Sequence, residues 1–208
     1  LQTVVAWEAQ DVIPALALLD AARARGRWIA GYVAYEAGFA LEPRLTALMP
    51  AGREGPLLAF GVYEGPVDAD AVLLTAKAEA AAVSMGVPIP QISQPVYDAA
   101  FARVAAYIAA GDCYQINLTF PMVARLHSGS ALGLYGALRV RQEVGHGVFC
   151  DLGVGPVVIS RSPELFFKVD ADGVIEARPM KGTAPRDADP VRDAALAAEL
   201  LASDKARA

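Results

Sequence analysis

The sequence has 208 residues, of which 55% are hydrophobic and 20% are charged, and its formal net charge is -5 at pH 7. This composition is typical of a globular protein and excludes a disordered chain. The low pI of about 5.1 argues against a nucleic-acid surface, and no run of 18 apolar residues indicates a membrane span. Small-molecule chemistry or a protein partner remains.

The first 83 residues predict a mixed α/β subdomain. Residues 3–7 have the apolar character of a short strand. Asp11 is a suitable N-cap for the helix that follows, because its carboxylate can accept a hydrogen bond from a free backbone N–H. We expect this helix to end near Gly26.

Two further strands are expected in this subdomain. Residues 27–35 are aromatic and β-branched with one glycine where close packing would need it, and residues 56–64 form a second apolar run. Residues 68–82 fit either a helix or a strand followed by a helix. Glu36 follows the first of these strands, where a salt bridge is a better interpretation than a site carboxylate.

Residues 84–95 carry three prolines, one glycine and no charge, which is typical of an extended connector between subdomains. The next residues, 96–110, predict the clearest helix of the sequence, and Gly111 is placed to end it. One apolar stripe runs along this helix with the spacing i, i+4, i+7 and i+11. The stripe consists of Tyr97, Phe101, Val104 and Ile108.

Residues 113–120 alternate strictly between apolar and polar side chains, which predicts a strand with two different faces. Gln115, Asn117 and Thr119 share the polar face. That face fits either contact with solvent or the lining of a polar cavity, and the residues alone leave both interpretations open.

The second half predicts antiparallel strands bracketed by helices. We expect a helix over residues 130–143, a hairpin over residues 148–160 and a second hairpin over residues 164–178. Asp189 and Pro190 are a suitable N-cap and first residue for a helix that runs to residue 208. This order of elements favours an α+β fold, a layered antiparallel-sheet sandwich with flanking helices.

Several kinds of chemistry find no support in the sequence. His127 and His146 match no zinc spacing, and Cys113 and Cys150 match neither a metal nor a redox spacing. No phosphate-binding loop and no GxSxG nucleophile motif is present. We interpret the cysteines as free thiols and, with no signal peptide in view, predict a cytoplasmic protein.

Lys181 is the unusual residue, because it stands between Met180 and Gly182 just after a predicted hairpin. Glu164 begins one strand of that hairpin and Lys181 follows its partner strand, so antiparallel pairing brings the two to the same end. Loss of water would make the lysine a better nucleophile and the carboxyl a better acid. A structural ion pair fits the spacing as well, and both alternatives stay open here.

Three motifs in order, GDCYQINLT (111–119), SRSPE (160–164) and RPMKGT (178–183), resemble the chorismate-utilising enzymes. Residues 31–37 and 200–205 fit the same family, so the resemblance spans most of the chain. Within the family the sequence is most similar to aminodeoxychorismate synthase component I. The implied fold is the chorismate-binding fold, like that of anthranilate synthase component I.

The subfamily resemblance depends on Lys181, because anthranilate synthases carry alanine at this position. It implies amination of chorismate to 4-amino-4-deoxychorismate, a step in folate and p-aminobenzoate biosynthesis. Lys181 would attack carbon C2 of chorismate while Glu164 protonates the departing C4 hydroxyl. Ammonia would then add at C4 and expel the lysine.

The resemblance also implies roles for Gln115, Gly182 and Thr183. Family members that add water to chorismate carry a lysine base at the position of Gln115, and glutamine cannot deprotonate water at pH 7. The Gly182 amide and Thr183 would contact the substrate. One departure is Met180, where isoleucine is usual, and this swap conserves volume.

The family also implies Mg²⁺ and a glutamine amidotransferase partner that supplies ammonia. The two glutamates that hold the metal would lie beyond Ala208, so we expect no metal ligands within this chain. The fold would be C-terminally incomplete, and the chain alone would be inactive. The predicted division is an N-terminal subdomain (1–83), a connector (84–95) and the first part of the catalytic region (96–208).

Two alternatives remain from the sequence. The chain could belong to an anthranilate synthase component I, which would make a different product from chorismate. It could also be a non-catalytic remnant or binding module, because the metal glutamates are expected outside it.

Overall fold

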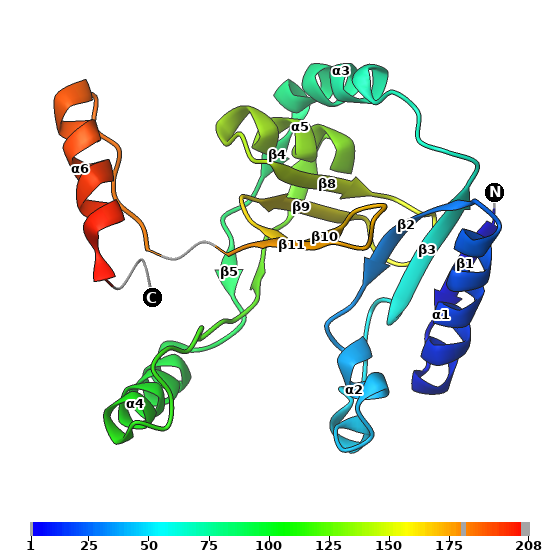
Figure 1. The fold of residues 1–208 in the computed structure, drawn as a ribbon, viewed down its shortest axis with the longest axis horizontal. Coiled ribbons are helices and arrows are strands. Elements are labelled where there is room, and N and C mark those ends of the chain that lie inside the picture. Colours follow the sequence, from blue (N-terminus) through cyan, green and yellow to red (C-terminus); the bar gives the residue numbers. More distant parts are fainter. Residues whose placement is uncertain (1, 180–181, 205–208) are drawn as a thin grey trace. The chain divides into compact units, whose positions relative to one another are not determined.

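The computed structural model describes residues 2–179 and 182–204, and the chain packs as two compact units (Figure 1). The first unit comprises residues 1–142 and 151–157, and the second comprises residues 143–150 and 158–208. The predicted division into an N-terminal subdomain, a connector at residues 84–95 and a catalytic region stays a prediction. In the described ranges, no helix is long and apolar enough to cross a membrane.

The first unit begins with a three-stranded antiparallel sheet in the order β1-β3-β2. The predicted strands are therefore confirmed, and β3 lies in the middle because it pairs with both of the others. One helix, α1, packs beside this sheet. The bounds are β1 (Gln2–Ala6), α1 (Ala9–Ala24), β2 (Trp28–Val33) and β3 (Leu58–Tyr63).

Helix α1 begins earlier than the sequence predicted. Glu8 occupies the N-cap without a side-chain cap bond, and Asp11 lies inside the first turn. The prediction of Asp11 as the cap is wrong. Ala9 and Gln10 have high helix propensity, so they extend the helix on its N-terminal side. The carboxylate of Asp11 still favours this end of the helix dipole. Gly26, with φ of 77°, follows the helix as expected.

The core of the first unit lies between α1 and the sheet. Leu57, Leu58 and Val12 are fully buried there, in a cluster made only of hydrophobic side chains. Gly31 in β2 is required by close packing, since a Cβ at this position would lie 2.1 Å from the Ala59 carbonyl oxygen. The glycine in the predicted strand therefore has the role that the sequence indicated.

Two short helical elements follow β2: α2 (Ala37–Leu41) and the 3₁₀ helix η1 (Thr46–Leu48). The ambiguous residues 68–82 form a helix, α3 (Asp70–Glu79), extended by the 3₁₀ helix η2 (Ala80–Ala82). The strand alternative for these residues is wrong.

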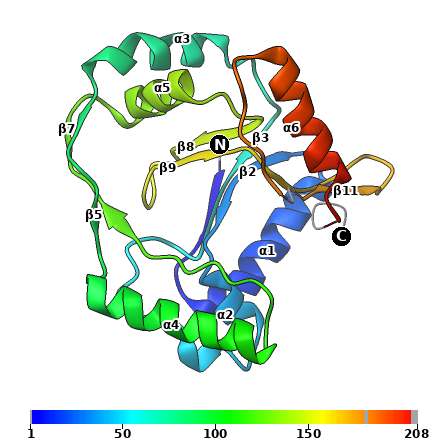
Figure 2. The same cartoon turned by 90° about the vertical axis from the view of Figure 1, so that its left-hand side faces the viewer.

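Helices α3 and α5 (Ala131–Arg141) lie side by side, as Figure 2 shows. Their close approach depends on Gly136, where a Cβ would lie 2.0 Å from the Ala76 carbonyl oxygen. Ser130 caps α5 by accepting a hydrogen bond from the Gly133 backbone N–H at 2.8 Å, and its hydroxyl also contacts Glu79.

The predicted connector at residues 84–95 is extended, but it also pairs with later residues. Two short strands within it form two-stranded antiparallel sheets. Strand β4 (Ser84–Met85) pairs with β7 (Leu126–Ser128), and β5 (Ile89–Pro90) pairs with β6 (Met122–Val123).

Helix α4 (Gln94–Ala110) confirms the clearest helix prediction, and Gly111 ends it with φ of 81°. The predicted strand at residues 113–120 is wrong, because no described strand pairs with it and a strand needs a partner for its backbone groups. Phe120 instead returns to α4, with its ring 5.5 Å from that of Tyr97.

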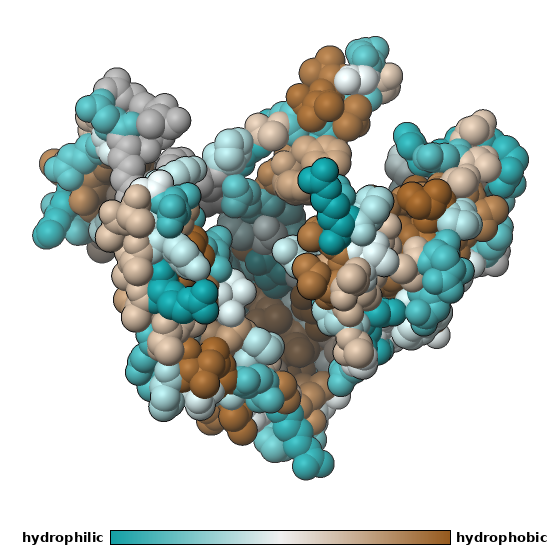
Figure 3. Space-filling view, turned by 90° about the horizontal axis from the view of Figure 1, so that it is seen from below, coloured by the Kyte–Doolittle hydropathy of each residue, from teal (hydrophilic) through white to brown (hydrophobic). Residues whose placement is uncertain are grey.

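The apolar stripe of α4 is not covered by the described residues. Phe101 is 57% exposed and Ile108 is 43% exposed. Hydrophobic side chains also lie at the surface among hydrophilic ones in the space-filling view of Figure 3. The stripe was a correct indicator of the helix, but the burial that it predicted does not occur in this structure.

The second unit consists of two antiparallel hairpins and one helix, which confirms both hairpin predictions. With the first unit it confirms an α+β content, while the stacking of sheets into a sandwich stays a prediction. The elements are β8 (His146–Cys150), β9 (Val158–Ser162), β10 (Leu165–Val169), β11 (Ile175–Arg178) and α6 (Pro190–Ala202).

Candidate functional site

The candidate site lies in the second unit, at one end of the β10–β11 hairpin. Leu165 and Arg178 are directly opposed in the ladder, so Glu164 and Pro179, the next residue on each strand, emerge at the same end. The turn at the other end is closed by a hydrogen bond from the Gly173 N–H to the Asp170 carbonyl. The hairpin therefore fixes the register that the prediction for Glu164 required.

A pocket with a volume of about 440 Å³ lies at this end of the hairpin. This volume falls within the range of small-molecule sites, roughly 300–1,000 Å³. Its lining combines one hydroxyl and one carboxyl with apolar side chains, the mixture of mostly apolar and a few polar groups that is typical of small-molecule sites. The lining residues are Ser162, Glu164, Leu165, Phe166, Ala177 and Pro179.

Ser162 fixes the backbone of Glu164. The Ser162 hydroxyl donates to the Glu164 carbonyl oxygen at 3.0 Å and accepts from the Glu164 N–H at 3.2 Å. These two bonds close a tight turn around Pro163, so the carboxyl-bearing residue has a defined position at the start of β10. Glu164 itself is exposed, so the partial burial expected for this carboxyl is not supplied by the described residues.

Lys181, the predicted nucleophile, and Met180 lie outside the described residues. The structure describes the chain up to Pro179 and again from Gly182. The proximity of the Lys181 amine to the Glu164 carboxyl therefore stays a prediction. Of its neighbours, Gly182 has φ of 78°, a left-handed conformation that favours glycine, and Thr183 is exposed.

A set of charges on the hairpin was not found by the sequence reasoning. Glu176 lies opposite Lys168 and accepts a hydrogen bond from its amine at 2.7 Å. The Arg178 guanidinium contacts the same carboxylate from two residues along the strand. Lys168 first and Arg178 second lower the pKa of the Glu176 carboxyl. Cross-strand register, once known, would have been the signal for this cluster.

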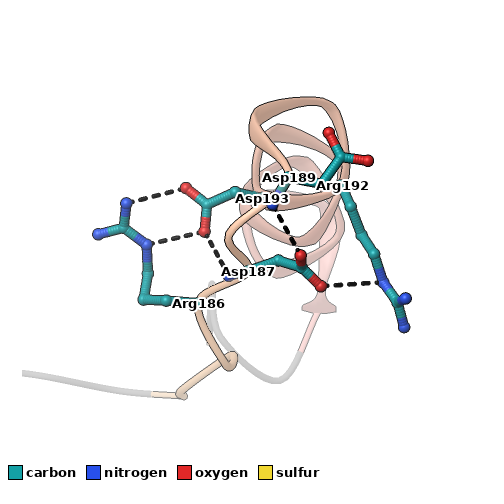
Figure 4. A network of polar contacts seen from close by, with 5 residues as sticks. All are labelled: Arg186, Asp187, Asp189, Arg192 and Asp193. Carbon is teal, nitrogen blue, oxygen red and sulfur yellow. Dashed lines mark hydrogen bonds and ion pairs between the residues drawn. The ribbon is translucent and has the colours of Figure 1, made fainter.

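A second polar network follows Thr183 and joins the chain to the first turn of α6 (Figure 4). Arg186 and Asp193 form a two-bond ion pair, with Nε to Oδ1 at 2.8 Å and Nη2 to Oδ2 at 2.9 Å. Asp187 contacts Arg192 at 3.2 Å. Asp189 caps α6, as predicted, by accepting from the Val191 N–H at 3.0 Å.

Gln115 lies in the first unit, on the exposed segment after Gly111. It therefore belongs to a different compact unit from Glu164, and its approach to the pocket stays a prediction. The two interpretations of its polar face, contact with solvent or the lining of a cavity, both remain.

Glu36 lines a smaller pocket of about 170 Å³ in the first unit, together with Tyr32, Arg53 and Pro156. The expected strand-end salt bridge of Glu36 is absent among the described residues, and Glu36 occupies the N-cap of α2 without a side-chain cap bond. Arg53 contacts this pocket while its guanidinium donates to the Trp7 carbonyl oxygen at 2.8 Å.

The side chains of residues 2–179 and 182–204 do not fit a metal ion. No three histidine, cysteine, aspartate or glutamate residues in these ranges come together as a set of ligands. His127 and His146 lie in different units. No chemical step is therefore assigned to a metal held by these residues.

Comparison with known proteins places the chain in a family. The model of the chorismate binding enzyme family matches residues 4–208. An aminodeoxychorismate synthase component 1 from Klebsiella aerogenes is 31% identical over 198 residues, which cover 86% of this chain and 43% of the relative. The corresponding protein of Escherichia coli is 37% identical over 112 residues, which cover 54% of this chain and 24% of the relative.

Anthranilate synthase component 1 from Streptomyces coelicolor is also similar, with 38% identity over 107 residues that cover 51% of this chain and 20% of the relative. The chain spans less than half the length of these curated relatives. No solved structure matches the chain significantly.

Proposed function

Because the chain belongs to the chorismate binding enzyme family, we propose that the protein carrying it aminates chorismate to 4-amino-4-deoxychorismate. One observation carries this proposal. The opposition of Leu165 and Arg178 brings Glu164 and the segment that leads to Lys181 to the same end of a hairpin, beside a pocket of suitable size. The similarity to aminodeoxychorismate synthases supports it.

The proposed reaction uses two side chains of this sequence. The neutral Lys181 amine forms a bond to C2 of chorismate, the two ring double bonds shift from C1=C2 and C5=C6 to C1=C6 and C4=C5, and the C4 hydroxyl leaves as water with a proton from Glu164. Ammonia then forms a bond at C4, both double bonds return, the lysine departs from C2, and the proton that ammonia loses restores Glu164. Chorismate and ammonia are thus converted into aminodeoxychorismate and water, and the lysine is regenerated.

The remaining site residues determine which nucleophile succeeds and how the substrate is held. Gln115 cannot remove a proton from water, so it favours amination over hydration. The left-handed conformation of Gly182 turns the backbone immediately after the lysine, and its amide with the Thr183 hydroxyl supplies donors for a substrate oxygen. The apolar wall of Leu165 and Phe166 suits the carbon ring.

The proposal includes features that rest on the resemblance alone. These are a Mg²⁺ requirement, a glutamine amidotransferase partner as the ammonia source, a layered sandwich fold for the complete protein, a role in folate synthesis, and a cytoplasmic location. No step of the proposed reaction is written through the metal.

The decisive experiment replaces Lys181 by alanine in the complete protein and measures product formation with glutamine and with free ammonia. We expect kcat to fall by at least about 10³-fold with both nitrogen sources, because loss of a covalent nucleophile removes a whole reaction path. Lys77→Ala is the matched control, since Lys77 is an exposed lysine on α3 in the other unit and does not line the pocket. Wild-type kcat in the Lys181→Ala variant would refute the assignment of Lys181 as the nucleophile.

The second candidate is an anthranilate synthase component I, which the similarity to the Streptomyces coelicolor protein favours. The lysine at position 181 argues against it, because the resemblance associates anthranilate synthases with alanine there. Product analysis separates the two candidates, since only anthranilate synthesis releases pyruvate and an aromatic ring in the same turnover.

A further inference from the structure

The pocket beside Glu164 is lined by residues of two separate hairpins in the second unit. Ser162 is the last residue of β9, whereas Leu165 begins β10, and both side chains line the pocket. Among the described strands of this unit, no pairing connects the β8–β9 hairpin to the β10–β11 hairpin. Pro163 and Glu164 are the covalent link between the two hairpins, so their conformation determines how the two sides of the pocket face each other.

Each end of this link is held by a strand ladder. Ser162 is opposite His146 in the β8–β9 ladder, and Leu165 is opposite Arg178 in the β10–β11 ladder. A ladder restrains the backbone of the residues that it pairs, but neither ladder includes the two residues of the link. The position of the carboxyl-bearing residue therefore depends on contacts outside the two ladders.

The Ser162 hydroxyl supplies such contacts. It donates to the Glu164 carbonyl oxygen at 3.0 Å and accepts from the Glu164 backbone N–H at 3.2 Å. The intervening Pro163 has a fixed φ and no N–H, and it restricts Ser162 to the extended conformation of a strand end. The Glu164 N–H is therefore the first main-chain donor after β9, and the serine hydroxyl satisfies it.

These bonds also determine what the Ser162 hydroxyl can do. A hydroxyl has one proton, and that of Ser162 is donated to the Glu164 carbonyl oxygen. Although its side chain lines the pocket, Ser162 is therefore not a proton donor to a ligand while the turn is closed. Among the described lining residues, the Glu164 carboxyl is the remaining acid, which fits its proposed role.

We propose that Ser162 is a positioning residue that holds Glu164, through its main chain, where the carboxyl can protonate the departing hydroxyl of the substrate. This inference rests on the proposed function, because it assigns the two bonds to the acid-catalysed step. Ser162 does not contact the reacting atoms in this scheme. A displacement of the carboxyl by about 1 Å would take it away from the leaving oxygen and slow the chemical step.

The experiment measures kcat and KM for chorismate in the complete protein, with ammonia as the nitrogen source. We expect Ser162→Ala to lower kcat by about 10- to 100-fold while KM changes by less than about threefold, because the acid is displaced but the pocket walls remain. Ser162→Thr keeps the hydroxyl and should retain kcat within about threefold of the wild type.

Ser160→Ala is the matched control for this series. Ser160 lies two residues earlier on β9, so it shares a face of the strand with Ser162, but it does not line the pocket. The control should keep kcat within about twofold of the wild type.

A double variant tests whether Ser162 acts through Glu164. Glu164→Gln alone should lower kcat by about 10²- to 10⁴-fold, because an amide cannot protonate the leaving hydroxyl. Adding Ser162→Ala should slow this variant by less than about a further twofold, since the residue that Ser162 positions has already lost its function. Losses that multiply in full in the double variant would overturn the proposal.

Other results would also overturn it. These are wild-type kcat in Ser162→Ala, a kcat in Ser162→Thr as low as in Ser162→Ala, and a rise in KM with unchanged kcat, which would make Ser162 a substrate contact. If Ser162→Ala fails to fold, Ser162→Cys takes its place, because a thiol is close in shape and only a weak donor. Wild-type kcat in Ser162→Cys would then overturn the proposal equally.

Hydrogen exchange of the Glu164 amide provides a readout that does not depend on activity. This amide donates to the Ser162 hydroxyl, so it should exchange faster in Ser162→Ala than in the wild type or in Ser160→Ala. Unchanged exchange would overturn the proposal even if aminodeoxychorismate is made. A wild-type protein that makes no aminodeoxychorismate but shows the faster exchange in Ser162→Ala would refute the proposed function and retain the contact between Ser162 and Glu164.

Discussion

The β1–β3 sheet and the β10–β11 hairpin are held together by different forces. The sheet is covered by α1, and Leu57, Leu58 and Ala6 are completely buried between them. In the second unit, no residue within 143–150, 158–179 and 182–204 is buried. The N-terminal region is thus stabilised by a hydrophobic core, whereas the site-bearing region depends on strand pairing and ion pairs.

The difference follows from the strands themselves. Strand β3 begins with a continuous apolar run and pairs on both edges, so it lies in the middle of a sheet with a covering helix. Strand β10 pairs on one edge only among the described strands, and Phe166 within it is 87% exposed. A two-stranded hairpin of this kind has little stability of its own in water. The candidate site therefore lies on the part of the chain that has fewer buried residues among those described.

Leu58→Ala should give the largest effect on this comparison. Removing a completely buried side chain leaves a cavity, so we expect a loss of about 2–5 kcal/mol in the free energy of unfolding of the 208-residue chain. Urea unfolding followed by tryptophan fluorescence measures it, because both tryptophans, Trp7 and Trp28, lie in the first unit. A loss below about 1 kcal/mol would show that this region has no real core.

Gly136→Ala should be the next largest. A Cβ at position 136 would lie 2.0 Å from the Ala76 carbonyl oxygen, so α5 would have to move away from α3 at a cost of about 1–3 kcal/mol. Gly38→Ala is the matched control, because Gly38 is also helical and nothing lies within 4 Å of its added Cβ. The control should be neutral or stabilising by up to about 1 kcal/mol in the same urea experiment. Equal changes in the free energy of unfolding for the two variants would refute the close contact between Gly136 and Ala76.

The pH dependence of the hairpin should differ from that of the sheet. Lys168 and Arg178 lower the pKa of Glu176 in the folded state, so the folded hairpin holds this proton less tightly than the unfolded chain does. The resulting stability is present above the unfolded pKa and is lost as the pH falls through the lower, folded pKa. Exchange protection of residues 165–178, corrected for intrinsic rates, should therefore decrease in acid below the ordinary glutamate range.

Glu176→Gln should remove this acid-dependent loss, while the β1–β3 sheet, whose described buried residues are hydrophobic, should show less change over the same pH range. A hairpin in the Glu176→Gln variant that still loses protection in acid to the same degree would contradict the assignment to Glu176.

Local chemistry explains which parts of the structure were predictable. The helix end at Gly111, the helix start at Asp189 and Pro190, and the hairpin over residues 164–178 were predicted correctly, because each depends largely on bonds within a few residues. The strand at residues 113–120 was wrong, because a strand depends on a partner that its own sequence does not specify.

The candidate site follows the same division. That Glu164 lies at the open end of the hairpin was predictable from the turn, but the exact register there was not, because the pairing shifts between Leu165 and Lys168. The pairing of Arg186 with Asp193 was not, because it depends on a backbone that folds back onto α6. Asp11 shows a third limit, since sequence indicates that a helix starts but not at which residue. The proximity of Lys181 to Glu164 stays a prediction.

Phe166→Ala should have the smallest effect on stability and the clearest effect on the site. Because this side chain is 87% exposed, its loss should change the unfolding free energy of the hairpin, measured by hydrogen exchange, by less than about 0.5 kcal/mol. Phe166 nevertheless lines the pocket beside Glu164, so KM for chorismate in the complete protein should rise by about tenfold through lost apolar contact.

Two outcomes of the Phe166→Ala experiment would contradict this assignment. A loss of stability above about 1 kcal/mol would show that the Phe166 ring is buried in a core of the complete protein. An unchanged KM would show that Phe166 does not contact the substrate. Leu58→Ala should change the free energy of unfolding without changing KM for chorismate. The two variants together therefore test whether the core and the candidate site occupy different regions.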